Sequence, residues 1–109
     1  MSTTFDDREN VFETKFAQDE AALFRAEARA VKLFGLWLAE KLGLTGEAAM
    51  HYAADLVIAN LDTPGLDDVV DKAEADLKVK NVTLSRLFLT ETLNTFFSQA
   101  KAQMVAEGK

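Results

Sequence analysis

The stretch AVKLFGLWLAEKLGL, residues 30–44, decides the fold class. Its apolar residues point to nearly every side of a helix: Ala30, Val31, Leu33, Phe34, Leu36, Trp37, Leu38 and Leu42. A helix that is apolar all round is buried by several neighbours, so we expect this one at the centre of a bundle with Trp37 inside. Gly35 predicts a close approach of a second helix, because an interior glycine costs ~1 kcal/mol and usually has a packing reason.

Breaking and capping residues divide the chain into four predicted helices, over 18–43, 46–61, 64–79 and 84–106. Gly43 ends the first helix, and each later helix follows a threonine that is its predicted N-cap: Thr45, Thr63 and Thr83. Pro64 suits the first helical position, and Asn81 suits a left-handed turn after the third helix. The connections are short, which favours antiparallel neighbours. The predicted fold is all-α, a four-helix bundle.

The composition agrees with an all-α fold and excludes several classes of function. A chain of 109 residues is one domain, with room for an arm, and its five glycines and one proline leave most of it free to be helical. The net charge of −6 disfavours nucleic acid and anionic membrane surfaces, which need clustered Lys and Arg. The absence of cysteine excludes disulfides and thiolate zinc sites.

Neither a membrane span nor a signal peptide is expected. The longest apolar stretch is interrupted by Glu40 and Lys41, which leaves it far short of the ~18 residues that a span needs. No apolar run follows a basic start at the N-terminus. We therefore expect a soluble, cytoplasmic protein with no membrane insertion.

One constellation has the residue types of a metal site. His51, the only histidine, lies four residues from both Glu47 and Asp55, so the three share a helix face. Metal sites in bundles draw ligands from several helices through Glu-x-x-His motifs, which this chain lacks. We predict a solvated face there and no metal.

Other motifs of catalysis or ligand binding are missing. The acidic run over 67–76 lacks the D-x-D-x-D-G pattern of a calcium loop, and no glycine-rich phosphate loop is present. The aromatic residues of the later chain are predicted to be core: Phe34, Trp37, Phe88, Phe96 and Phe97. These observations indicate a binding protein rather than an enzyme.

The opening stretch TTFDDRENVFETKFAQDE, residues 3–20, carries a thin apolar stripe among charges. Phe5, Phe12, Phe16 and Leu23 are spaced by seven, four and seven residues, which places them on one side of a helix. A helix from residue 6 to Leu42 would be roughly 55 Å long and would exceed the diameter of a domain this size. Either the stripe packs on its own bundle, or it anchors the segment in a partner's cleft.

Three motifs together resemble the zeta inhibitor subunit family of the alphaproteobacterial ATP synthase. They are TTFDDRE at residues 3–9, F-E-x-K-F-A-x-D-E at 12–20 and L-x-G-L-W-x-A-E-x-L-G at 33–43. A weaker match continues through HYAADLVIANLD and the segment 100–104. The resemblance implies a four-helix bundle with a mobile N-terminal arm. It also implies that the arm inserts into a catalytic interface of the ATP synthase head and blocks ATP hydrolysis.

On this resemblance, residues 1–17 are the inhibitory arm and residues 18–109 the bundle. The implied partner-binding residues are Phe5, Asp6, Asp7, Arg8, Glu9, Phe12, Glu13, Lys15 and Phe16. The implied partner is the catalytic head with its alpha, beta and gamma subunits, which would place the protein peripherally at the inner membrane. Adenine nucleotide is a further ligand that the family suggests, although no residue here is assigned to it.

The chain also departs from the family pattern. Ala30 and Val31 follow Arg29 where the family tends to have basic and polar residues, and TLSRLFLTETLNTFFSQ, residues 83–99, is more apolar than expected. That segment predicts exposed apolar surface and self-association. The competing function is a small adaptor or self-associating bundle that does not act on an ATPase. A nucleotide sensor is a third alternative, which the resemblance to the family alone suggests.

Overall fold

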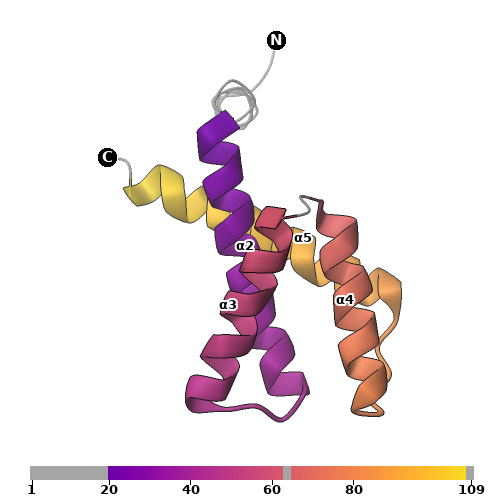
Figure 1. Ribbon diagram of the computed structural model, residues 1–109. Helices are drawn as coiled ribbons and strands as arrows, with labels where there is room; N and C mark the ends of the chain where they lie inside the picture. The colour runs from indigo at the N-terminus through magenta and orange to yellow at the C-terminus, as the bar shows by residue number, and fades with distance from the viewer. Residues whose placement is uncertain (1–19, 63–64, 108–109) are drawn as a thin grey trace.

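Four helices make up the part of the chain that the structure, a computed structural model, describes: residues 20–62 and 65–107 (Figure 1). They are α2 (Glu20–Lys41), α3 (Gly46–Asp62), α4 (Leu66–Val79) and α5 (Arg86–Glu107). No strand occurs in these residues, so the all-α, four-helix prediction is confirmed. None of these helices is long and apolar enough to cross a membrane.

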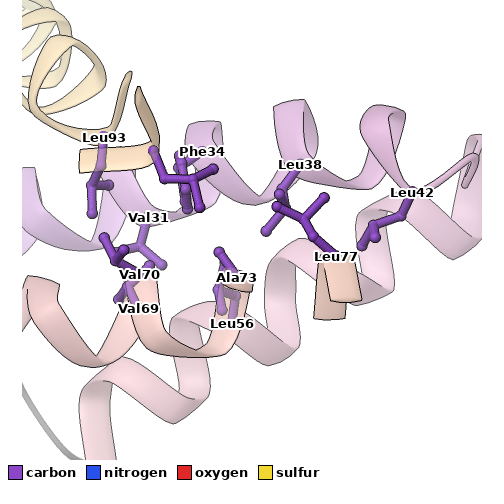
Figure 2. Packing of buried hydrophobic residues seen from close by; sticks show 11 residues of the cluster. Val31, Phe34, Leu38, Leu42, Leu56, Val69, Val70, Ala73, Leu77 and Leu93 are labelled. Atoms are coloured by element: carbon purple, nitrogen blue, oxygen red, sulfur yellow. The ribbon is translucent and has the colours of Figure 1, made fainter. Parts of the chain in front are cut away.

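The central helix is α2, as its apolar pattern predicts. It packs against all three other helices, and most extensively against α3 and α5. Figure 1 shows α3 running beside α2, α5 crossing behind this pair, and α4 to the right of the pair, next to the first turns of α5. The main core, shown in Figure 2, draws buried side chains from every helix: Val31, Phe34, Leu38, Leu42, Leu56, Val69, Val70, Ala73, Leu77, Leu89 and Leu93.

Gly35 is the point of closest approach between α2 and α3. A Cβ atom at this position would lie 2.8 Å from the Cα of Ala53, a distance that real Cβ atoms do not adopt. Nearby, the Asn60 side-chain amide donates to the Glu27 carboxylate at 2.9 Å. The packing role predicted for Gly35 is confirmed, and the two contacts fix the register of the antiparallel pair.

Two helices end in the same way, with a residue of positive φ. Gly43 has φ 81° and Asn81 has φ 60°. The next N–H in each case reaches back five residues, from Leu44 to the Ala39 carbonyl at 2.8 Å and from Val82 to the Leu77 carbonyl at 2.9 Å. These bonds are those of the Schellman motif. The left-handed turn predicted at Asn81 is therefore confirmed.

The predicted starts of the last two helices are wrong by two residues. Helix α4 begins at Leu66 with Gly65 at the N-cap, not at residue 64; Thr63 and Pro64 lie outside the described residues. Helix α5 begins at Arg86, and the cap is Ser85, whose Oγ accepts the Phe88 N–H at 3.1 Å. Thr83 is not the cap, because Ser85, which directly precedes the first residue of the helix, supplies the capping hydroxyl.

Burial of the aromatic residues also differs from the prediction. Phe34 is fully buried, but Trp37 is only partly buried at the edge of the core. Its ring packs against Phe34 and Phe88 at centroid distances of 5.6 and 5.9 Å, with the Lys41 ammonium 5.4 Å from its centroid. Phe88 is 46% exposed and Leu87 is 69% exposed. The exposed apolar surface predicted for this part of the chain is thus present.

Candidate functional site

The predicted partner-binding residues lie outside the described part of the chain. These are Phe5, Asp6, Asp7, Arg8, Glu9, Phe12, Glu13, Lys15 and Phe16, together with the proposed boundary of the arm at residue 17. Leu23 is the member of the apolar stripe that the structure describes. The candidate site within the described residues is therefore the start of α2, which leads toward these residues and which we call the base of the arm.

A small second cluster holds this base. Ala22 and Ala26 are buried on α2, and the residues packed against them are Leu23, Phe97, Met104 and Val105. We call these six residues the arm-base cluster. The two alanines leave room for α5 to approach, because a methyl group is the smallest side chain that still buries apolar surface. Leu23, the last residue of the stripe, is therefore partly buried in a cluster that also holds side chains of α5.

An ion pair fastens the end of α5 to α2 beside this cluster. The Arg29 guanidinium donates to both oxygens of the Glu107 carboxylate, at 2.8 and 2.9 Å, and to the Gln103 side-chain oxygen at 3.4 Å. The two parallel bonds form the planar fork that arginine makes with carboxylates. Accepting these bonds lowers the pKa of Glu107, and the same bonds raise the pKa of Arg29. These bonds thus hold the end of α5 against α2 beside the arm-base cluster.

The first turns of α2 project past α5 in Figure 1 and lead toward the residues before Glu20. Leu23 is the residue of the stripe that the structure describes, and Phe5, Phe12 and Phe16 lie outside the described residues.

The candidate metal constellation is exposed, as predicted. Glu47, His51 and Asp55 are each exposed on α3. Among the described residues, no group of three or more His, Cys, Asp or Glu side chains is placed to hold a metal ion. The three residues thus form a solvated face of α3.

Sequence analysis missed a polar link between α3 and α4. The Tyr52 hydroxyl donates to Asp76 Oδ2 at 2.6 Å, and the Lys72 ammonium donates to the same oxygen at 3.0 Å. Burial, with the hydrogen bond to Asp76, raises the pKa of Tyr52, which keeps the phenol protonated. This link ties two helices together and has no signal in the local sequence pattern, because its members lie 24 residues apart.

One hollow lies at the turn between α4 and α5. It has a volume of about 370 Å³ and is lined by residues of the end of α4 and of the turn that follows, including Glu74, Lys78, Asn81 and Thr83. Of these side chains, Glu74 is paired with Arg86 at the surface. This hollow and the arm-base cluster have no described residue in common.

Together these features define a small all-α protein in which several polar side chains bridge helices and a segment rich in charged and aromatic residues precedes the central helix. The family model of the ATPase inhibitor subunit zeta matches residues 1–103, and the chain belongs to that family. The match spans the opening motifs as well as the bundle, so the resemblance drawn from the three motifs is confirmed. The family name describes a regulatory inhibitor subunit. No sequence among the curated proteins matches the chain.

Proposed function

We propose that this protein inhibits ATP hydrolysis by the catalytic head of the ATP synthase, and that residues 1–17 do so by inserting into a catalytic subunit interface. Membership of the inhibitor family supports the first part. The observation that carries the second is the apolar stripe of Phe5, Phe12 and Phe16, which lies within the matched residues 1–103 and shares one side of a helix with Leu23. A narrow apolar stripe among charged residues is suited to a partner's groove.

The proposed anchors are Phe5, Phe12 and Phe16. Burying a phenylalanine is worth about 1.5–3 kcal/mol, so three of them can offset the cost of ordering the segment in a groove. The charged residues between them set orientation at the rim of the groove: Arg8, Glu9, Glu13 and Lys15. Asp6 and Asp7 stand at the start of the segment, where negative charge stabilises a helix.

The proposed partner is the head with its alpha, beta and gamma subunits. Binding to it would place the protein peripherally at the inner membrane, through the ATP synthase and not through a membrane helix of its own. The proposed role is regulatory: the inserted segment obstructs the catalytic interface physically and contributes no catalytic groups.

Deleting residues 1–17 tests the proposal. We expect the truncated protein to keep a nearly unchanged thermal midpoint, because the described helices already bury a core of their own that extends from Val31 to Leu93. We expect it to lose inhibition of ATP hydrolysis by the cognate head. A truncated protein that still inhibits fully, or that unfolds, would show that the arm is a structural part of the bundle.

A double substitution, Phe12→Ser with Phe16→Ser, separates the apolar anchors from the length of the arm. It should abolish inhibition as the deletion does. The matched control is Phe88→Ser, the same chemical change at an exposed position of α5, which should leave inhibition intact. If the wild-type protein does not co-purify with the head at all, the adaptor function is the better description.

A further inference from the structure

Asn60 on α3 is a buried polar side chain with one atom left unpaired. The residue is 5% exposed. Its Nδ2 donates to the Glu27 carboxylate of α2 at 2.9 Å. Its Oδ1 is buried and accepts no hydrogen bond from any described residue. Buried amide groups are normally satisfied at both atoms, so this oxygen indicates a further donor beside Asn60.

A small hollow borders Asn60 on the side of α4. It is lined by three residues of α3 and three of α4: Leu56, Ala59, Asn60, Asp68, Val69 and Lys72. Its volume is about 30 Å³. A water molecule needs roughly 10–15 Å³, whereas sites for organic ligands have about 300–1,000 Å³. The size therefore restricts the occupant to water or to an ion of similar size.

The charged groups at this hollow favour water over an ion. Asp68 and Lys72 are four residues apart, on the same side of α4, and both are exposed, so they border the open side of the hollow. A cation in the hollow would lie beside the Lys72 ammonium. An anion would lie beside Asn60 Oδ1 and the Asp68 carboxylate. Water both donates and accepts hydrogen bonds, so it suits all three groups.

Other contacts hold Lys72 near the hollow. Its ammonium donates to Asp76 Oδ2 at 3.0 Å and lies 5.9 Å from the centroid of the Tyr52 ring. The Tyr52 hydroxyl donates to the same Asp76 oxygen at 2.6 Å, so the three side chains position one another. An ammonium group has three N–H donors, and the bond to Asp76 uses one of them. Lys72 therefore keeps donors for a water molecule.

We propose that one ordered water molecule binds in this hollow. The water donates to Asn60 Oδ1 and to the Asp68 carboxylate, and it accepts from the Lys72 ammonium. Three hydrogen bonds are the usual number for a buried water. With the bond from Asn60 to Glu27, a continuous polar connection then crosses α2, α3 and α4. The site is separate from the arm-base cluster, which contains none of these residues.

The first test is a crystal structure of the full-length protein at a resolution that shows ordered water. We expect a water oxygen at about 2.7–3.2 Å from Asn60 Oδ1 and within the same range of Asp68 or Lys72. Every copy of the chain in the crystal should hold it. A hollow without this water overturns the proposal. So does an Asn60 Oδ1 that accepts directly from a side chain, such as the Thr63 hydroxyl or the Lys72 ammonium.

The second test is a double-mutant cycle on the folding equilibrium constant, measured by urea denaturation. Val69→Ile adds a methylene group at the hollow, which displaces the water and leaves Asn60 Oδ1 unpaired. The constant should therefore fall about fivefold or more. In an Asn60→Leu background no oxygen is left unpaired, so Val69→Ile should change the constant less than about twofold. Glu27 lacks its partner in both members of that second pair, so this loss cancels.

Val70→Ile is the matched control. It adds the same group at a buried valine of α4 that does not line the hollow, so its effect should be equal in the two backgrounds. If Val69→Ile also has equal effects in the two backgrounds, its cost is overpacking alone and the proposal is wrong. Neither test depends on inhibition of an ATPase.

Discussion

Asn81 holds a backbone conformation that most side chains avoid. Its φ of 60° closes α4, and the following N–H of Val82 then reaches the Leu77 carbonyl at 2.9 Å. Glycine adopts this conformation without cost, whereas a side chain with a branched Cβ pays about 1–2 kcal/mol. At the residue scale, one asparagine therefore determines where α4 ends and where the turn to α5 begins.

This argument predicts opposite outcomes for two substitutions at one position. Asn81→Gly should leave the free energy of unfolding unchanged or slightly higher, and Asn81→Val should lower it by about 1–2 kcal/mol. Urea denaturation followed by circular dichroism measures both. Equal stability of the two variants would show that the positive φ is not required in solution.

Glu107 carries a prediction about pH. Its pKa is lowered in the folded state because its carboxylate accepts two bonds from Arg29. The stabilisation is therefore present above the ordinary pKa of a glutamate and is lost as the pH falls through the lowered value. An NMR titration of the Glu107 carboxyl should show the low pKa, and Arg29→Gln should return it to the ordinary range. An unchanged pKa in that variant would mean that the ion pair does not persist in solution.

At the scale of helices and turns, much of the fold follows from local pattern, but two helix starts do not. The apolar spacing of residues 66–77 and the positive φ at Asn81 are local properties, so the end of α4 could be predicted closely from the sequence. The start of α5 could not, because both Thr83 and Ser85 can cap a helix. Leu84 lies between these two residues and packs against the main core as part of the preceding turn. The helix therefore begins after Ser85, two residues later than predicted.

The corrected cap is testable by a matched pair of substitutions. Ser85→Ala should destabilise the protein by about 1 kcal/mol, because the Phe88 N–H loses its acceptor. Thr83→Ala should change stability by no more than about 0.5 kcal/mol, as expected for an exposed residue without such a bond. Thermal denaturation of both variants beside the wild type decides between the two residues. A larger effect at Thr83 would favour the start that the sequence alone predicts.

At the scale of the whole molecule, α2 belongs to two separate clusters. Its C-terminal half lies in the main core with α3, α4 and α5, and its N-terminal half packs on α5 in the arm-base cluster. The second cluster could not be predicted from the sequence. Its ion pair joins Arg29 to Glu107 across 78 residues, and Ala22 and Ala26 have no apolar bulk to mark them as buried. The partner-binding residues of the arm remain a prediction.

This division predicts that the two clusters open separately. Leu77→Ala removes a fully buried side chain from the main core, so it should lower the global free energy of unfolding by about 2–5 kcal/mol and speed hydrogen exchange at all slowly exchanging amides. Met104→Ala removes a side chain from the arm-base cluster alone. It should speed exchange in the first turns of α2 and the last turns of α5, while amides around Leu38 and Leu77 keep their wild-type protection. Amide exchange measured by NMR on both variants distinguishes these patterns. Uniform loss of protection in Met104→Ala would mean that the bundle opens as one unit and that the base of the arm cannot loosen without unfolding the protein.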